Sequence, residues 1–289
     1  MYTSILGGYE RLNEDQSQSS DIDFVCFTDD PELTSDVWDI VHVSPAFPLD
    51  PHRSQRRVKI LGHARLNQYR ESMYIDNTVS LRGEVNELFE TMLGDADMGM
   101  AHHSYHSQLH EEFAAVWSAG IDDYHRLMEQ WDHYTALSPE ALGGPALWGG
   151  IIVRRNTTDV KALCETWYEH VLRYSRRDQL SVPVAVLLHP NVKFAMRELD
   201  NFRSPWHEWP VVLERKVQMR AGMSAVRVPR DLSELVSAYD RTIAMEQRLA
   251  AQAAELESLT QSIAKIHSSR SWRVTAPLRK LRQRLETKS

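Results

Sequence analysis

The chain has 289 residues, of which 42% are hydrophobic and 25% are charged, a composition typical of soluble globular proteins. That length suffices for one large domain or two small ones, and no apolar run approaches the ~18 residues of a membrane-spanning helix. The first residues lack the basic start and apolar stretch of a signal peptide, so we expect a cytosolic protein. The two cysteines, Cys26 and Cys164, should then be free and buried.

The formal charge of −7 is unevenly distributed along the chain. Residues 268–289 carry seven basic side chains and one acidic side chain, a net +6 that leaves −13 for residues 1–267. An acidic main body argues against a nucleic-acid-binding surface, so we expect no nucleic-acid partner. The basic tail needs its own explanation.

Strand and helix patterns alternate through the first 80 residues. The alternation predicts βαβ units and therefore a mainly parallel sheet. Ligands of such sheets bind beyond the carboxyl ends of the strands, and Asp29, Asp30 and Asp76 all follow a predicted strand. The predicted strands are residues 1–7, 23–28, 38–43 and 72–75, and the predicted helix is residues 51–70.

The middle of the chain mixes both patterns. An apolar run at residues 183–188 has the length of a core strand. Together the patterns predict an α/β domain over residues 1–230, with a mixed, mainly parallel sheet flanked by helices. The remaining predicted elements are strands at 98–102 and 146–153 and helices around 111–119, 123–131 and 159–174.

From about residue 231 the pattern becomes a heptad repeat without Gly or Pro. It predicts a long helix over residues 231–268 that forms a coiled coil and so a homo-oligomer. The seam positions are Leu235, Ala238, Thr242, Met245, Leu249, Gln252, Leu256, Leu259, Ile263 and Ile266.

The last segment, residues 269–289, is a basic amphipathic tail. Val274, Leu278, Leu281 and Leu285 recur at helical spacing beside several arginines and lysines. Such a segment is typical of a helix that binds an anionic membrane surface. The alternative is a disordered tail or one that docks on another protein.

Several common nucleotide and hydrolase motifs are missing from the sequence. It contains no P-loop, no Gly-x-Gly-x-x-Gly fingerprint, no Gly-x-Ser-x-Gly elbow and no paired Cys-x-x-Cys. What remains is a set of carboxylates at strand ends and a basic helix.

Asp76 and Asn77 give the best local signal, because they end an apolar strand abruptly. A carboxylate there is held rigidly and suits a hard cation or a sugar hydroxyl. Sugar-nucleotide transferases place an Asp-x-Asp at such a position to hold Mn²⁺ or Mg²⁺ on the diphosphate, but Thr78 replaces the second carboxylate here. The alternative is an aspartate that caps local N–H groups.

A basic stripe runs along the helix predicted at residues 51–70. His52, Arg56, Lys59 and His63 share one face, flanked by Arg53 and Arg57. Cations beside strand-end carboxylates suit a diphosphate leaving group, whose charge grows as the glycosidic bond breaks. A solvated helix face is the alternative.

Histidines gather at residues 102–110. His103, His106 and Glu111 are candidates for binding an acceptor substrate, and plain surface histidines are the alternative. Histidines at i and i+4 share a helix face, so a zinc site is a third interpretation. The full group is His102, His103, His106 and His110 with Glu111 and Glu112.

A polar segment, Arg177-Asp178-Gln179, lies between a predicted helix and an apolar run. Asp178 is placed to accept hydrogen bonds from sugar hydroxyls, and Gln179 to point its carbonyl at an anomeric carbon. A loop with a helix-capping aspartate is the alternative.

Several motifs occur in the order found in one family. The sequence resembles the glycosyltransferase-like family, long described as a domain of unknown function, whose plant members are linked to mucilage polysaccharide synthesis. The resemblance covers about residues 1–210. The motifs are residues 2–9 (YTSILGGY), 23–31 (DFVCFTDDP), 53–63 with its Arg, Lys and His, 74–77 (YIDN) and 175–181 (SRRDQLS).

The resemblance implies a GT-A-like fold, with a Rossmann-related nucleotide-binding half joined to an acceptor-binding half. The Asp178-Gln179 pair is similar to the Asp-Gln pair of retaining family-eight transferases, which touches the donor sugar. The implied donor-site residues are Asp29 or Asp30 near the nucleoside, Lys59 with Arg56 or Arg57 near the diphosphate, and Asp76 at a metal or ribose. Arg53 and Asn77 belong to the same implied donor site. Related transferases supply a late histidine as a metal ligand, and His189 or His207 fits that position.

The tail carries a second resemblance. Residues 269–279 (SRSWRVTAPLR) are similar to the tail of many bacterial polysaccharide glycosyltransferases. We therefore expect a bacterial glycosyltransferase that moves sugar from a nucleotide sugar to a glycan acceptor in cell-surface polysaccharide assembly, by a retaining mechanism. We expect it in the cytoplasm and peripheral on the inner face of the membrane. Two alternatives are a metal-dependent hydrolase of the amidase or ceramidase kind, because one plant member has been described as a ceramidase, and a non-catalytic assembly partner.

Overall fold

A computed structural model describes residues 1–8, 10–19, 21–211 and 232–277. The chain divides into two compact units, Met1–Ser233 and Glu234–Ser289. In the described ranges no helix is both long enough and apolar enough to cross a membrane. Cys26 and Cys164 are free and buried, as expected from the sequence.

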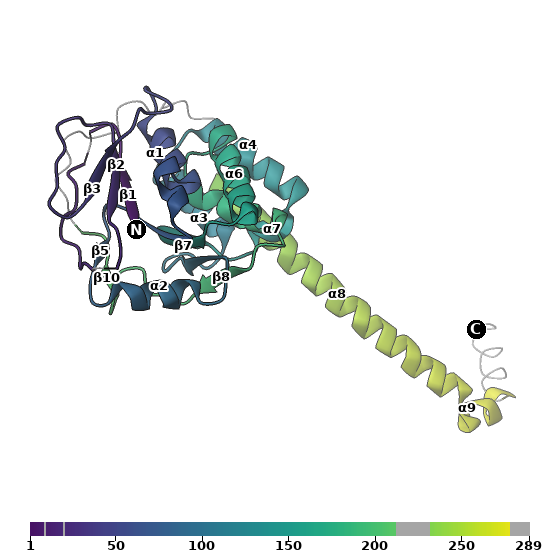
Figure 1. The fold of residues 1–289 in the computed structure, drawn as a ribbon. Helices are drawn as coiled ribbons and strands as arrows, with labels where there is room; N and C mark the ends of the chain where they lie inside the picture. The colour runs from purple at the N-terminus through teal and green to yellow at the C-terminus, as the bar shows by residue number, and fades with distance from the viewer. Residues whose placement is uncertain (9, 20, 212–231, 278–289) are drawn as a thin grey trace. The chain divides into compact units, whose positions relative to one another are not determined.

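The first unit is built around a seven-stranded sheet in the order β3-β2-β1-β4-β7-β6-β8 (Figure 1). Only β7 runs antiparallel to its neighbours within this sheet. The predicted fold class, a mixed and mainly parallel sheet flanked by helices and followed by a long C-terminal helix, is confirmed. The strands are β1 (Tyr2–Ile5), β2 (Val25–Thr28), β3 (Asp39–His42), β4 (Glu71–Ile75), β6 (Met98–His102), β7 (Leu147–Arg155) and β8 (Phe194–Arg197).

Alternating side chains of the central strands bury themselves on the two faces of the sheet. Tyr74 of β4 packs into the cluster formed with α1 and α6, whereas Met73 and Ile75 pack into the cluster formed with α2. This period of two is what a strand covered on both faces requires. The helices of the unit are α1 (Pro51–Leu61), α2 (Val85–Leu93), α3 (Leu109–Ser118), α4 (Tyr124–Leu137), α5 (Pro139–Leu142), α6 (Thr158–Arg173) and α7 (Val182–Leu188).

Two predicted elements differ from the structure. The helix predicted at residues 51–70 ends at Leu61, because Gly62 takes a φ of 73° that stops the helix, and a short 3-10 helix, η1 (Ala64–Gln68), follows. The apolar run at residues 183–188 belongs to the helix α7 instead of a strand. Pro183 lies in its first turn, where proline is tolerated, and short apolar runs do not distinguish a strand from a buried helix.

A small second sheet pairs segments that the sequence patterns did not reveal. It has the order β5-β10-β9 and joins the segment after β4 to residues near 205. Its strands are only two residues long, too short for a periodicity to be visible. They are β5 (Ser80–Leu81), β9 (Arg203–Ser204) and β10 (His207–Glu208).

The second unit contains α8 (Leu232–Ser268) and α9 (Arg270–Val274). Six of its described apolar seam residues are exposed, and Ala238 is half-buried. The side chain of Leu235, and residues 278–289 of the predicted tail helix, lie outside the described residues. The long helix is confirmed, and the coiled coil stays a prediction. The exposed seam residues are Met245, Leu249, Leu256, Leu259, Ile263 and Ile266.

Candidate active site

The carboxyl ends of β1 and β4 meet where the strand order of the sheet reverses. Strands β2 and β3 lie to one side of β1, and β4 lies to the other, with all four parallel. Ligands of open α/β sheets bind at this switch point. Asp76 follows β4 directly, and its backbone N–H donates to the carbonyl of Gly150 at 2.8 Å.

Four of the predicted site residues converge at this point. Asp178 begins the 3-10 turn η2 (Asp178–Leu180), and its carboxylate lies 2.9 Å from Arg56 Nε and 2.8 Å from Lys59 Nζ. Lys59 Nζ also lies 3.3 Å from Asp76 Oδ1. Arg56 and Lys59 are one turn apart on α1, so a single helix face supplies both cations.

The Lys59–Asp178 pair is removed from water almost completely, with side-chain exposures of 2% and 1%. Burial by itself raises the pKa of Asp178, but the charges of Arg56 and Lys59 outweigh it and hold that pKa well below its usual range. Asp178 is therefore ionised, and its negative charge is stabilised by the two cations Arg56 and Lys59. Because desolvation of such a group costs several kcal/mol, removing one partner is far more disruptive than at the surface.

A hydrogen-bonded chain supports Asp76 from beneath. Tyr74 donates its hydroxyl to Asp76 Oδ1 at 2.7 Å, and Gln55 Nε2 donates to that hydroxyl at 2.7 Å and to Ser4 Oγ at 3.1 Å. Burial and then the charge of Asp76 raise the pKa of Tyr74 far above its ordinary value, so the phenol keeps the proton that it donates. One oxygen of Asp76 is thereby fixed in direction.

An irregularity in β7 brings backbone up to the charged cluster. The pairing of β6 with β7 shifts between Met100 and Ala101 and bypasses Gly149 and Gly150. A Cβ atom on Gly149 would lie 3.0 Å from Lys59 Nζ and 3.4 Å from an oxygen of Asp178, so glycine lets the strand approach this closely. Bulges of this kind often occur beside active sites.

The η2 turn is anchored at both of its functional residues. Trp167 of α6 donates its indole N–H to the carbonyl of Asp178 at 2.8 Å. Gln179 donates its side-chain amide to the carbonyl of Leu147 at 3.2 Å. Because the amide nitrogen is committed to Leu147, the orientation of the Gln179 carbonyl is fixed as well.

The structure places the remaining predicted donor-site residues in local contacts. Asp29 accepts the backbone N–H of Gly7 at 2.9 Å, and Asp30 accepts that of Glu32 at 3.0 Å. Asp29 thus still lies at the carboxyl end of β1, beside the switch point. Asp30 closes the turn after β2.

Asn77 and Arg53 are tied into the scaffold. Asn77 is buried, donates to the carbonyl of Arg11 at 2.9 Å and accepts the backbone N–H of Asn13 at 2.9 Å, which holds the segment after β1 in place. Arg53 donates to the carbonyls of Val171 and Tyr174 and so joins α1 to α6. Arg57 is exposed and does not join the Asp178 cluster; it lines a different cavity.

A second charged cluster forms around Glu112 of α3. His106 Nδ1 lies 2.7 Å, and His103 Nε2 3.8 Å, from one oxygen of Glu112, and Arg177 Nε lies 3.1 Å from the other. The rings of His103 and His106 stack with centroids 4.9 Å apart. Arg177 precedes Asp178 in the chain, so the Glu112 cluster adjoins the Asp178 cluster.

His102, His110 and Glu111 do not join that cluster. His102 pairs with Glu198 at 3.2 Å. His110 is buried with its Nδ1 3.0 Å from the carbonyl of Leu142. Glu111 accepts backbone N–H groups of Ser107 and Gln108 and forms a capping box at the start of α3.

The Glu112 cluster is built as a hydrogen-bond network. His103 Nδ1 accepts the backbone N–H groups of Tyr105 and His106, so the neutral ring carries its proton on Nε2, toward Glu112. Desolvation lowers the pKa of His103 and favours this neutral form. His103, His106 and Glu112 are the one group of three possible metal ligands in the described part of the chain. Metal binding there would require the other tautomer of His103 and competition with Arg177.

Neither late histidine joins Asp76 in a group of three metal ligands within the described ranges. His189 Nε2 lies 2.8 Å from Thr166 Oγ1. His207 is fully buried, with Nδ1 2.7 Å from Ser204 Oγ and Nε2 3.0 Å from the carbonyl of Asn201. The described residues thus supply no group of three metal ligands that includes Asp76, and a Mn²⁺ or Mg²⁺ site there stays a prediction.

Some residues of the site carry no strong signal in the sequence. Gly149 lets the backbone of β7 approach Lys59 and Asp178 closely, and Trp167 anchors the η2 turn. Gln55 acts through its hydrogen bond to the hydroxyl of Tyr74. The Gly149-Gly150 pair inside an apolar strand was the one available sign, because glycine in a strand often marks a bulge or a close backbone contact.

The fold and the site together define an α/β domain with a charged cluster at a sheet switch point, the position where ligands of open α/β sheets bind. The chain belongs to the TOD1/MUCI70 glycosyltransferase-like domain family, whose sequence profile matches residues 14–204. No curated protein matches this chain.

Three solved structures are similar to the chain at low identity. The bifunctional glycosyltransferase WbbM in its apo form has a TM-score of 0.43 and 8% identity, with 68% of this chain and 38% of WbbM covered. Mouse xyloside xylosyltransferase 1 in its apo form has a TM-score of 0.35 and 14% identity, with 65% of this chain and 76% of that enzyme covered. Galactosyltransferase LgtC with donor and acceptor sugar analogs has a TM-score of 0.35 and 12% identity, with 61% of this chain and 63% of LgtC covered. TM-scores this low establish neither a shared fold nor a shared activity.

Proposed function

We propose that this protein is a glycosyltransferase that moves a hexosyl group from a nucleotide sugar to a glycan acceptor. The observation that carries the proposal is the buried Asp178 carboxylate, held by Arg56 and Lys59 at the switch point of the sheet. Membership of a glycosyltransferase-like family supports it independently.

The donor diphosphate binds where Arg56 and Lys59 converge. In the free protein these cations are balanced by Asp178 and Asp76, so their positions are fixed before a donor arrives. Negative charge develops on the diphosphate as the glycosidic bond breaks, and preorganised cations stabilise that charge without reorganisation. Asp29 or Asp30, at the ends of neighbouring strands, lies toward the nucleoside.

The donor sugar lies against η2. Asp178 accepts hydrogen bonds from sugar hydroxyls, and Gln179 presents its carbonyl to the anomeric carbon, since its amide nitrogen is committed to Leu147. By analogy with the Asp-Gln pair of retaining transferases, transfer proceeds with retention. No step is assigned to a metal, because the described residues around Asp76 lack a matched set of ligands.

The acceptor binds on the side of the Glu112 cluster. A groove of about 640 Å³ is lined there by His102, His103, Ser104, Glu198 and Phe202, among others. Polar groups beside an aromatic ring suit a sugar, which has hydroxyls at its edge and an apolar face. His106, held by Glu112, faces the same region, because its ring stacks on His103.

The second unit serves assembly. The exposed seam of α8 forms a coiled coil with a second copy of the chain, and the basic tail binds anionic lipid on the inner face of the bacterial membrane, where cell-surface glycans are assembled. Flotation with vesicles tests the tail. Full-length protein should float with anionic vesicles at low salt, and a chain lacking residues 269–289 should not; equal recovery with neutral vesicles would assign the tail to a protein partner.

A thermal-shift screen against a panel of sugar nucleotides, with and without Mn²⁺, tests the proposed function. A ligand that binds the folded state alone raises its melting temperature, so at least one donor should do so. That donor should then be hydrolysed or transferred to an acceptor glycan, with release of nucleoside diphosphate. If no sugar nucleotide shifts the melting temperature, the transferase proposal fails, and the non-catalytic assembly role takes its place.

A further inference from the structure

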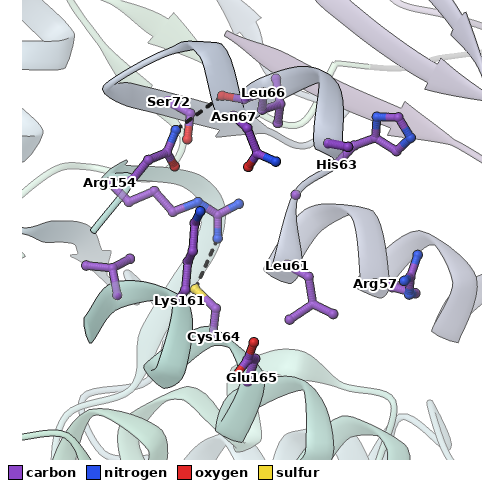
Figure 2. A pocket seen from close by; sticks show the side chains of 14 residues that line it. Arg57, Leu61, His63, Leu66, Asn67, Ser72, Arg154, Lys161, Cys164 and Glu165 are labelled. Carbon is purple, nitrogen blue, oxygen red and sulfur yellow. Dashed lines mark hydrogen bonds between the residues drawn. The ribbon is translucent and has the colours of Figure 1, made fainter. Parts of the chain in front are cut away.

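A second polar cavity lies away from the proposed donor site. It has a volume of about 450 Å³ and is enclosed by the end of α1, the 3-10 helix η1 and the first turns of α6 (Figure 2). Arg154, which lines it, pairs in register with Ser72 near the amino end of β4, whereas Asp76 follows the carboxyl end of that strand. About four residues of strand, roughly 13 Å, therefore separate the two levels.

Arg154 is a buried cation without a carboxylate partner among the described residues. Its guanidinium donates to the carbonyls of Lys59 and Ile60, to the hydroxyl of Tyr2 and to Cys164 Sγ. The carbonyls belong to the last turn of α1, whose partial negative charge offsets part of the guanidinium charge. None of these partners carries a full negative charge.

Neither ionisable neighbour supplies that charge at neutral pH. Burial raises the pKa of Tyr2 to about 12, and burial also raises the pKa of the Cys164 thiol. Both groups therefore stay protonated and neutral. Buried charges in proteins are normally paired, so a lone guanidinium beside a cavity marks a position for an anion.

Other basic groups surround the same cavity. Arg57 and Lys161 are exposed at its rim, and within the described ranges neither forms an ion pair with a carboxylate. Glu165 is the one acidic side chain of the lining, against the three cations Arg57, Arg154 and Lys161. Figure 2 shows the three cations among the side chains that line the cavity.

We propose that this cavity binds a small phosphate-bearing anion, with Arg154 at its floor and Arg57 and Lys161 at its rim. Arginine and lysine are the side chains that recognise phosphate, and Asn67 and Ser72 in the lining add neutral polar contacts. The volume exceeds that of inorganic phosphate and falls in the range of small-molecule sites, so a phosphomonoester fits the cavity better than free phosphate.

Calorimetric titration of the full chain with inorganic phosphate and with glycerol 3-phosphate tests this site at constant ionic strength. Wild type should bind both, the ester more tightly. The double variant Arg57→Ala/Lys161→Ala should weaken both by about tenfold or more, the loss expected for two charged donors. The control is Arg173→Ala, on the same helix but outside the cavity, which should bind like wild type.

Two further variants separate this site from the others. Arg56→Ala alters the proposed donor site and should leave phosphate binding unchanged; a loss there instead would assign the phosphate to the donor site. Arg154→Lys keeps the positive charge but loses the forked hydrogen-bond donors of the guanidinium group, so it should weaken binding. This comparison holds if the melting temperature of the variant stays near that of wild type. Binding of inorganic phosphate alone would assign the site to free phosphate. No binding by wild type, or equal binding by the double variant, would overturn the proposal.

Discussion

Two buried carboxylates organise the charged residues of this domain, and they differ in their partners. Asp178 is held by Arg56 and Lys59, whereas Glu112 is held by His103, His106 and Arg177. Arg177 and Asp178 are consecutive, so one peptide bond joins the two clusters. On the proposed function, the Asp178 cluster belongs to the donor site and the Glu112 cluster adjoins the acceptor site, so the two sites differ in the side chains that hold their central carboxylate.

The largest effect should come from Asp178→Asn. The substitution removes the negative charge beside buried Lys59 and half-buried Arg56, and breaking a buried ion pair costs about 3–5 kcal/mol. Urea unfolding should show that loss, and transfer should fall below detection. Asp39→Asn breaks the exposed pair with Arg65 and should change the unfolding free energy little. A stable, active Asp178→Asn would remove Asp178 from the centre of the site.

A smaller effect is expected at the other carboxylate. Glu112→Gln removes the charge that His106 and Arg177 share, for a loss of about 1.5–3 kcal/mol, the range for hydrogen bonds to charged groups. The KM for the acceptor should rise while the affinity for donor stays the same. Glu129→Gln, at an exposed pair, is the matched control. A rise in donor Kd without a change in acceptor KM would reverse the assignment of the two sides.

The pH dependence of stability should distinguish the buried histidines from Asp178. Burial lowers the pKa of His103 and, to about 4, those of His52 and His170. The unfolded chain, with histidine near 6.5, then binds more protons than the folded chain, so the unfolding free energy falls as pH drops from about 6.5 toward 4.

Asp178 behaves differently, because its pKa is lowered: its contribution is complete above the usual carboxylate pKa and is lost progressively as the pH falls from there through its own lowered pKa. The loss of stability from about pH 6.5 toward 4 should therefore come from the three histidines. Urea unfolding of wild type and His103→Gln at several pH values gives the measurement. A profile that is flat down to pH 4 would contradict the buried, neutral state of these histidines.

The smallest effect on catalysis should come from the second unit. Removing residues 232–289 should leave a folded domain that binds donor as tightly as the full chain but sediments as a monomer, because the exposed seam of α8 is then gone. Analytical ultracentrifugation of both chains measures this. A full-length chain that sediments as a monomer would contradict the coiled coil.

The strand ends of the site were predictable, because apolar runs that stop at acidic residues are visible locally. Asp76 and the basic face of α1 therefore appear in the sequence as candidates. Their convergence with Asp178 does not, because the contact joins residues about 100 positions apart and depends on the packing of α1 against α6. Long-range contacts leave no periodicity in a single sequence.

Other predicted site residues bind backbone groups that the sequence does not place beside them. Arg53 and Asn77 are polar residues beside the site, but backbone carbonyls lie closer and engage them. The end of α1 at Leu61 depends on the φ of a single glycine, which weighs little in a pattern over many residues. Gly149 matters because it has no side chain, which lets β7 approach Lys59 and Asp178. That role can be recognised once these neighbours are placed by the fold.

Calorimetric titration of Lys59→Met tests the central claim most directly. The variant keeps the length of the side chain and removes the charge that bridges Asp178 and Asp76. The nucleotide is the one identified by the sugar-nucleotide panel, and Lys193→Met, at an exposed pair, is the control. The nucleoside diphosphate should bind Lys59→Met at least about tenfold more weakly than wild type, a loss of about 1.4 kcal/mol, while the nucleoside binds both equally. Equal affinity of both proteins for the diphosphate would contradict a donor site at Lys59.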